Sequence, residues 1–339
     1  MLARGGSMTL LSVTDLSVHF PVRRQGLLGP KQVLRAVDTV SFDLKAGETL
    51  AIVGESGSGK TTTALAVARL VNAAGGSVKL DGQEILGTEG EALRQLRSSV
   101  QFIFQDPYSS LNPRRRAEEL VREPLDSLTD KSPAEKQEIV DDLFAAVGLR
   151  TEQQRLFPHQ FSGGQRQRIG IARALATRPR LVICDEPVSA LDVAVQAQIL
   201  NLLRRLQDQF NLTYLFVSHD LGVVQHMSDT IAVMYMGRIV ELADRMRLFN
   251  TPQHPYTAAL LSAVPTVSKA ARAAQKRILI PGDPPDPINL PSGCRFANRC
   301  PLARDACRAT EPTLTDTGGG HMAACHFPTE TASLRAPAA

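Results

Sequence analysis

The residues Gly54-Glu55-Ser56-Gly57-Ser58-Gly59-Lys60-Thr61 decide the fold, and they follow the apolar run Thr49 to Val53. Such a loop between a strand and a helix binds phosphate, because its glycines let successive backbone N–H groups point at one anion. Lys60 is expected to reach the β- and γ-phosphates of a nucleotide, and Thr61 to ligate Mg²⁺. A flexible Gly/Ser turn is the alternative, and the flanking strand and helix disfavour it. The predicted nucleotide-binding residues of this loop are Gly54, Glu55, Ser56, Gly57, Ser58, Gly59, Lys60, Thr61 and Thr62.

Length and composition limit the classes of protein to which this chain can belong. The chain has 339 residues, which at about 150 residues per domain predicts roughly two domains. Hydrophobic residues make up 43% and charged residues 21%, so a disordered or collagen-like chain is not expected. The net charge is only +4 and the longest basic run is Arg114 to Arg116, so nucleic acid is not an expected partner. No long uncharged apolar stretch and no N-terminal signal core are present, so we expect neither a membrane span nor secretion.

The pattern of apolar runs indicates an α/β fold with a parallel core sheet. Ahead of that sheet, Leu11 to Phe20 and Thr39 to Leu44 are predicted as antiparallel strands, joined by a loop through Gly26 to Pro30. The core strands are expected where the chain is apolar on both faces: Thr49 to Val53, Val100 to Phe104, Leu181 to Cys184, Tyr214 to Ser218 and Ile231 to Met236.

Helix signals separate most of these strands. Ser132-Pro133-Ala134-Glu135 is a capping box with proline at the first helical position, and its helix is predicted to end at Gly148. The segment Ala194 to Phe210 also has helical apolar spacing. After about Arg245, frequent prolines indicate a second, irregular module. We therefore predict a nucleotide-binding domain over 8–245, a C-terminal extension over 246–328 and a disordered tail over 329–339.

Two acidic residues, Asp185 and Glu186, end the apolar run that starts at Leu181. Asp185 fits a Mg²⁺ partner, because Mg²⁺ prefers hard oxygen ligands, and Glu186 fits the group that polarises an attacking water. A solvated acidic strand end is the alternative. His219 follows another buried run, and alone it would be read as a structural histidine.

The segment Phe161-Ser162-Gly163-Gly164-Gln165-Arg166-Gln167-Arg168 resembles the signature motif of ABC-type ATPases. Gln105 matches that family's Q-loop, Ser189-Ala190-Leu191-Asp192 its D-loop and His219 its switch histidine. The resemblance covers the whole first domain and implies a helical subdomain beside the sheet. It also implies ATP hydrolysis with Mg²⁺, in a dimer whose subunits close head to tail.

The resemblance assigns roles to single residues. Glu186, His219 and Gln105 are expected to be catalytic, and Gln105 is expected to help Thr61 and Asp185 hold Mg²⁺. Phe20 is the candidate platform for adenine, and an ordinary core residue is its alternative. The remaining nucleotide-binding residues, which are expected to cover the ATP held by the partner subunit, are Ser162, Gly163, Gly164 and Gln165.

Further motifs resemble the oligopeptide and dipeptide importer branch, and most closely its second ATPase subunit. They are Gln105 to Arg114, Tyr235 to Glu241, His254 to Thr257 and the cysteine-containing tail. The branch implies a second ATPase subunit as heterodimer partner, two transmembrane permease subunits and an extracytoplasmic solute-binding protein. The chain is then expected at the cytoplasmic face of the membrane. A related importer for nickel, glutathione or sugars is the alternative. A soluble ABC ATPase is disfavoured, because the chain has neither a second ATPase domain nor a coiled-coil insertion.

Four of the five cysteines gather near the end of the chain, in the pattern C-x5-C-x6-C-x17-C. Structural zinc sites usually have closer C-x2-4-C pairs, so zinc is disfavoured and stays open. Two disulfides or free thiols also stay open, although the near-absence of cysteine elsewhere suggests a reducing compartment. The resemblance to the importer branch implies a [4Fe-4S] cluster held by Cys294, Cys300, Cys307 and Cys325. The fifth, Cys184, is predicted to be a small core residue.

Overall fold

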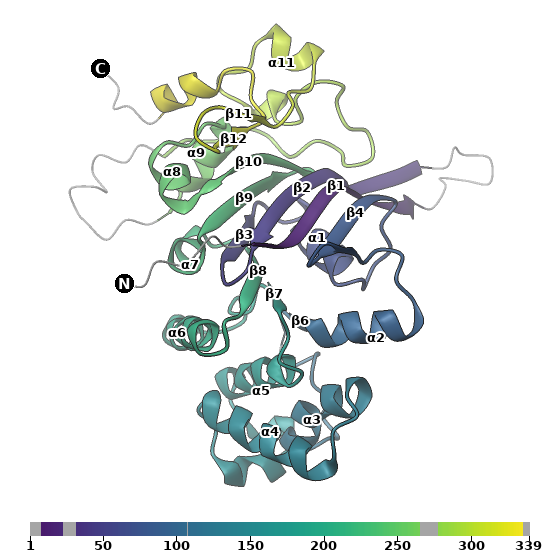
Figure 1. The fold of residues 1–339 in the computed structure, drawn as a ribbon. Helices are drawn as coiled ribbons and strands as arrows, with labels where there is room; N and C mark the ends of the chain where they lie inside the picture. Colours follow the sequence, from purple (N-terminus) through teal and green to yellow (C-terminus); the bar gives the residue numbers. More distant parts are fainter. Residues whose placement is uncertain (1–7, 23–31, 107, 265–276, 335–339) are drawn as a thin grey trace.

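The computed structural model describes residues 8–22, 32–106, 108–264 and 277–334 (Figure 1). The predicted Gly26 to Pro30 loop lies outside these ranges. The strands are β1 (Thr9–Val22), β2 (Gln32–Lys45), β3 (Thr49–Val53), β4 (Gly75–Leu80), β5 (Gln83–Glu84), β6 (Val100–Ile103), β7 (Leu181–Asp185), β8 (Thr213–Ser218), β9 (Thr230–Tyr235), β10 (Arg238–Asp244), β11 (Thr315–Asp316) and β12 (Met322–Ala323).

The helices lie mostly between these strands, as the sequence predicted. The α-helices are α1 (Lys60–Val67), α2 (Gly90–Ser99), α3 (Ala117–Leu128), α4 (Pro133–Ala146), α5 (Gly163–Leu175), α6 (Val193–Phe210), α7 (Leu221–Met227), α8 (Arg245–Asn250), α9 (Pro255–Ser262) and α11 (Asp305–Ala309). Short 3-10 helices are η1 (Thr151–Arg155), η2 (Pro158–Gln160), η3 (Ala297–Arg299) and η4 (Pro328–Leu334). In the described part of the chain, no helix is long and apolar enough to cross a membrane.

The larger sheet has the strand order β11-β12-β10-β9-β3-β8-β7-β6. The five strands from β9 to β6 are parallel, which confirms the predicted parallel core. Strand β3 lies at its centre, with Ile52 beside Val217 of β8 and Ala232 of β9. Because parallel strands all end at one edge, the residues that follow β3, β7 and β8 lie close together there.

Two hydrophobic cores bury both faces of this sheet, which explains why its strands are apolar throughout. Leu50 and Ile52 face one core, together with α1 and the β1–β2 pair. Ala51 and Val53 face the other, together with α5 and α6. The alternation along β3 is the two-residue period of a strand, with both sides covered.

A second, four-stranded sheet has the order β2-β1-β4-β5 and is antiparallel. The predicted pairing of β1 with β2 is confirmed, but β2 begins at Gln32 rather than at Thr39. Its first five residues, Gln32 to Ala36, are exposed or half-buried and do not alternate regularly between apolar and polar side chains. Backbone pairing, including Phe20 beside Leu34, extends the strand there.

Helices α3, α4 and α5 form a separate group below the sheet in Figure 1, far from the C-terminal region, and this is the expected helical subdomain. The predicted capping box of α4 is present: the Ser132 hydroxyl accepts from the Glu135 N–H at 3.3 Å. The Ser132 N–H in turn donates to the Glu135 carboxylate at 2.8 Å. Gly148 follows the helix at φ +72, a conformation that favours glycine at a helix end.

The C-terminal region packs against the larger sheet at the top of Figure 1. Strand β12 extends the sheet by pairing with β10, with Ala323 beside Glu241. The prediction of a disordered tail from residue 329 is wrong for 329–334, which lie in η4. There Thr331 is buried and donates to the Gln253 carbonyl at 3.0 Å. The segment η4 also packs against α9, and composition alone does not reveal this contact. Residues 335–339 lie outside the described ranges.

Candidate active site

The phosphate-binding loop joins β3 to α1, as predicted. Gly54, Gly57 and Gly59 have φ values of +154, +78 and +104, which side chains rarely adopt. Space is also restricted, since a Cβ on Gly54 would lie 2.1 Å from the Met234 carbonyl oxygen. A Cβ on Gly59 would lie 2.3 Å from the Ala36 carbonyl oxygen. The loop therefore needs glycine at these two positions.

Lys60 is buried at the start of α1, and its ammonium lies inside the loop. Its Nζ donates to the Gly54 carbonyl at 2.9 Å and to the Glu55 carbonyl at 2.8 Å. Burial lowers the pKa of Lys60, and the carboxylates of Glu186, Asp185 and Glu55 oppose that shift. The loop thus carries a cation in its centre, where the phosphates of a nucleotide would lie.

Thr61 and Asp185 meet beneath the loop. The Thr61 hydroxyl donates to Oδ1 of Asp185 at 3.0 Å, which joins the start of α1 to the end of β7. Burial raises the pKa of Asp185, and the Thr61 hydrogen bond opposes that shift. A buried carboxylate beside a hydroxyl offers the hard oxygen ligands that Mg²⁺ prefers.

Glu186 lies between the two other residues expected to be catalytic. Its Oε2 accepts from Nε2 of Gln105 at 2.9 Å, and its Oε1 lies 3.0 Å from Nδ1 of His219. The backbone of Glu186 has φ +46, a strained conformation for a residue with a side chain. The Glu186 N–H donates to the Val217 carbonyl at 2.9 Å, which ties the strained residue to β8. Parallel strand ends thus bring together residues that are 81 and 33 positions apart in the sequence.

One open cleft of about 840 Å³ runs along the loop and these side chains. Phe20 lines it with 38% of its surface exposed, opposite Leu34 of β2. Sequence reasoning missed Leu34, Arg35 and Ala36 on this wall, although the Phe20–Leu34 register would have indicated them. It also missed Pro287 and Leu290 of the C-terminal region, for which no local signal exists.

The signature residues lie elsewhere, at the N-terminus of α5. The Ser162 hydroxyl accepts from the Gln165 N–H at 3.3 Å, and the Ser162 N–H donates to the Gln165 side chain at 3.0 Å. None of the residues from Ser162 to Gln165 is among those lining the cleft at the phosphate-binding loop. This part of the candidate site therefore does not face the nucleotide position of its own chain.

The four C-terminal cysteines line one small cavity of about 20 Å³, together with His254 and His326. None of the four forms a disulfide. Burial raises the pKa of Cys294 to about 11 and that of Cys325 to about 12. Among the described residues, no three His, Cys, Asp or Glu side chains form a group suited to a single metal ion. Cys184 is fully buried in β7, as predicted for a core residue.

Comparison with known proteins agrees with this geometry. Residues 37–189 match the family model of the ABC transporter, and residues 240–307 match that of the oligopeptide/dipeptide transporter, C-terminal region. The oligopeptide transport ATP-binding protein AppF of Bacillus subtilis (strain 168) is 47% identical over 321 residues, which cover 94% of this chain and 97% of AppF. The chain belongs to the ATP-binding subunits of the oligopeptide/dipeptide ABC transporter family. The fold and the ATPase class predicted from the motifs are thereby confirmed.

Other relatives have similar lengths. The dipeptide transport ATP-binding protein DppF of Escherichia coli (strain K12) is 45% identical over 316 residues, covering 93% of each chain. Among solved structures, the dimeric post-hydrolysis state of the ATP-binding cassette MJ0796, bound to ADP and Pi, matches with a TM-score of 0.61. It is 27% identical and covers 70% of this ABC ATPase and 99% of MJ0796. The family match thus extends into the C-terminal region, which lies beyond the shared cassette.

Proposed function

We propose that this ABC ATPase hydrolyses ATP to drive the import of peptides, with Glu186 as the residue that polarises the attacking water. The observation that carries the proposal is the placement of Glu186 between Gln105 and His219, beside the phosphate-binding loop. The match of residues 240–307 to the oligopeptide/dipeptide transporter region supports peptides as the transported class.

In the proposed reaction, a water oxygen attacks the γ-phosphorus of ATP and the bond from that phosphorus to the β–γ bridging oxygen breaks. ADP and inorganic phosphate are the products. Glu186 orients the water and accepts its proton, while His219 contacts the γ-phosphate. Lys60 turns from the Gly54 and Glu55 carbonyls to the β- and γ-phosphates. Catalysis is then mostly positioning and charge stabilisation.

The residues present fit a Mg²⁺ ion beside the phosphates. Thr61, Asp185 and Gln105 would hold it, since they supply a hydroxyl, a carboxylate and an amide oxygen at one end of the loop. When bound, Mg²⁺ neutralises charge on the phosphate oxygens. Burial raises the pKa of Asp185, and a divalent cation beside its carboxylate would oppose that shift.

Two subunits are needed for a complete site in this proposal. Ser162, Gly163, Gly164 and Gln165 present the N-terminus of α5, which favours anions, and they do not line their own chain's cleft. They would cover the ATP bound by the partner ATPase subunit, and closure of this heterodimer would move two transmembrane permease subunits at the cytoplasmic face of the membrane. A solute-binding protein outside that membrane would deliver the peptide.

The test is transport in vesicles that contain the permease subunits and the partner ATPase, with the solute-binding protein added. We expect peptide to stimulate ATP hydrolysis and labelled peptide to accumulate inside. Lys60→Ala is expected to abolish both, whereas Lys79→Ala, at an exposed lysine of β4, is expected to retain both. Stimulation by nickel or glutathione and none by peptides would contradict the proposed substrate.

We also propose that Cys294, Cys300, Cys307 and Cys325 hold a [4Fe-4S] cluster. Support comes from the donor set, four free thiols around one cavity. A single zinc ion draws sulfurs to about 2.3 Å from one point, whereas a cubane is larger and takes donors that are farther apart. Since no three of the described His, Cys, Asp or Glu side chains form a group suited to a single metal ion, we propose the cluster rather than zinc. A bound cluster would supply a cross-link between these segments and a centre that can exchange one electron.

Anaerobic purification decides this second proposal. We expect about four iron and four sulfide per chain, with visible absorbance that bleaches on reduction. Cys300→Ser is expected to lower the iron content, and Cys184→Ser, in a buried strand away from the cavity, serves as the matched cysteine control. Stoichiometric zinc without iron would contradict the cluster.

A further inference from the structure

Arg299 of the C-terminal region forms an ion pair with Glu55 of the phosphate-binding loop, although the two are 244 positions apart. Nη1 of Arg299 lies 2.9 Å from Oε2 of Glu55, and Nη2 lies 3.3 Å from Oε1. The Arg299 side chain is only 9% exposed, whereas that of Glu55 is 32% exposed. A bidentate ion pair of this kind balances the charge of the carboxylate and sets its orientation.

A second contact holds the backbone of the same residue. The Glu55 N–H donates to the hydroxyl of Tyr256 at 2.8 Å, and Tyr256 is a fully buried residue of α9. The Tyr256 ring packs on Tyr235 with 4.7 Å between ring centroids. Both the side chain and the amide of Glu55 are therefore held by residues outside the loop.

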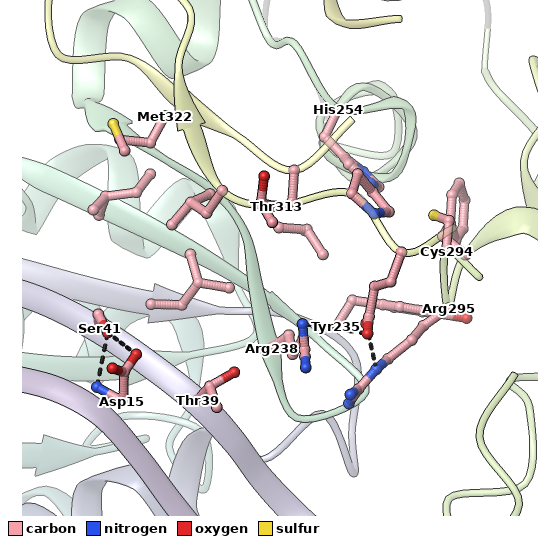
Figure 2. A pocket seen from close by; sticks show the side chains of 18 residues that line it. Asp15, Thr39, Ser41, Tyr235, Arg238, His254, Cys294, Arg295, Thr313 and Met322 are labelled. Atoms are coloured by element: carbon pink, nitrogen blue, oxygen red, sulfur yellow. Dashed lines mark hydrogen bonds and ion pairs between the residues drawn. The ribbon is translucent and has the colours of Figure 1, made fainter. Parts of the chain in front are cut away.

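The turn that carries Arg299 is itself well anchored. The Arg299 N–H donates to the Phe296 carbonyl at 2.9 Å, and the Phe296 ring meets Tyr235 edge-on at 84°. Arg295, the residue before Phe296, forms ion pairs with Asp38 of β2 and, at 2.9 Å, with Glu311. Figure 2 shows Arg295, with Tyr235 nearby, on the wall of an adjacent cavity of about 390 Å³. Arg299 thus extends from a rigid support rather than from a free loop.

The charge of Glu55 matters because its loop binds a polyanion. An unpaired carboxylate within the loop would repel the phosphates and could draw Lys60, whose Nζ is 2.8 Å from the Glu55 carbonyl, away from them. A guanidinium that neutralises Glu55 and turns it toward the C-terminal region removes that repulsion. Arginine suits the role, because its planar fork meets both carboxylate oxygens.

We propose that Arg299 is a positioning residue for ATP binding, which acts by neutralising and holding Glu55. The C-terminal region then forms part of the working nucleotide site. The proposal rests on ATP binding at the phosphate-binding loop, and it does not depend on what the four cysteines hold.

The test is a double-mutant cycle on the full chain, with ATP affinity measured by calorimetry in the presence of EDTA. Arg299→Gln, which removes the charge and keeps a polar N–H donor on a shorter side chain, is expected to raise the Kd by about tenfold. Arg299→Lys keeps the charge and is expected to recover most of the affinity. In a Glu55→Gln background, where no charge needs neutralising, Arg299→Gln is expected to change the Kd by less than about threefold.

Arg308→Ala is the matched control, because Arg308 follows Cys307 as Arg299 precedes Cys300 and it is 57% exposed. Equal Kd values for Arg299→Gln and the control would overturn the proposal while leaving ATP binding intact. A tenfold loss that persists in the Glu55→Gln background would also overturn it, since Arg299 would then act by another route. Absence of ATP binding by the unmodified chain would overturn the nucleotide function itself and this proposal with it.

Discussion

Nδ1 of His219 lies 3.0 Å from Oε1 of Glu186, which joins the residue after β8 to the residue after β7. Because Gln105 donates to the other carboxylate oxygen, both oxygens of Glu186 are held. A carboxylate fixed in this way is oriented before any nucleotide arrives, and it has little freedom to lose on binding.

His219→Ala is expected to lower the rate of ATP hydrolysis at saturating ATP by about 100-fold or more, with a much smaller change in KM. The physical reason is that His219 orients Glu186 and contacts a group that changes charge during the reaction. Steady-state kinetics of the assembled transporter measure this effect. His226→Ala, at an exposed histidine of α7, is the control, and a rate for His219→Ala equal to that control would contradict the role of His219.

The surroundings of the loop glycines allow a prediction about the free energy of unfolding. Gly54→Ala places a Cβ 2.1 Å from a backbone oxygen, whereas Gly57→Ala meets nothing within 4 Å. Gly57→Ala is therefore expected to cost only about 1–2 kcal/mol for its positive φ, and Gly54→Ala clearly more. Urea unfolding of the two variants without nucleotide measures the difference. Equal free energies of unfolding would show that the loop rearranges freely.

Buried His254 predicts a pH dependence of stability. Burial lowers its pKa to about 3, and its Nδ1 accepts from the Tyr256 N–H at 3.1 Å. Below the unfolded-state pKa of about 6.5, the unfolded chain binds a proton that the folded chain does not. The contribution of neutral His254 to the free energy of unfolding is thus fully present above that pH. It is lost progressively as the pH falls toward 3.

His254→Asn removes this titration and keeps an acceptor for the Tyr256 N–H, because asparagine is a good N-cap. Between pH 7.5 and 5.5 the unmodified chain is expected to lose about 1.4 kcal/mol more stability than the variant. Urea unfolding at the two pH values provides the measurement. Parallel losses in the two proteins would show that His254 is protonated in the folded state as readily as in the unfolded one.

Ser162→Arg is expected to block ATP-driven association with the partner ATPase while leaving ATP binding to the same chain's loop in place. A long cationic side chain would occupy the start of α5, where the partner's nucleotide is proposed to bind, and Ser162 does not line its own chain's cleft. Sedimentation with ATP and a hydrolysis-deficient partner reports association, and calorimetry reports binding. ATP-driven association of the variant to the unmodified extent would contradict the shared site.

Much of the site was predictable because its signals are local. The loop at Gly54 to Thr61 and the acidic pair at the end of β7 each lie next to an apolar strand, and parallel strand ends meet at one edge. The contact of Glu186 with His219 follows from that topology, since β7 and β8 are neighbours. The role of Glu186 was predicted from its position after the apolar strand, and the family resemblance assigned it the same role.

The remainder depends on contacts between distant segments, for which the sequence carries no periodic signal. Arg299 reaches Glu55 from the C-terminal region, which also joins the larger sheet through the pairing of β12 with β10. The order of η4 likewise depends on a distant contact, the hydrogen bond from Thr331 to the Gln253 carbonyl, whereas β2 starts early at Gln32 because it pairs with β1. Packing against α9 ordered residues 329–334, which composition alone describes as small and polar.

Hydrolysis by Glu186→Gln tests the central claim most directly. The substitution keeps the size of the side chain and removes the carboxylate that polarises water, so it leaves ATP binding possible. In vesicles that contain the complete transporter, with the partner ATPase's own catalytic glutamate also replaced, we expect ATP binding to persist and phosphate release to fall by about 100-fold or more. Phosphate release by this transporter at the rate of the unmodified protein would contradict the claim.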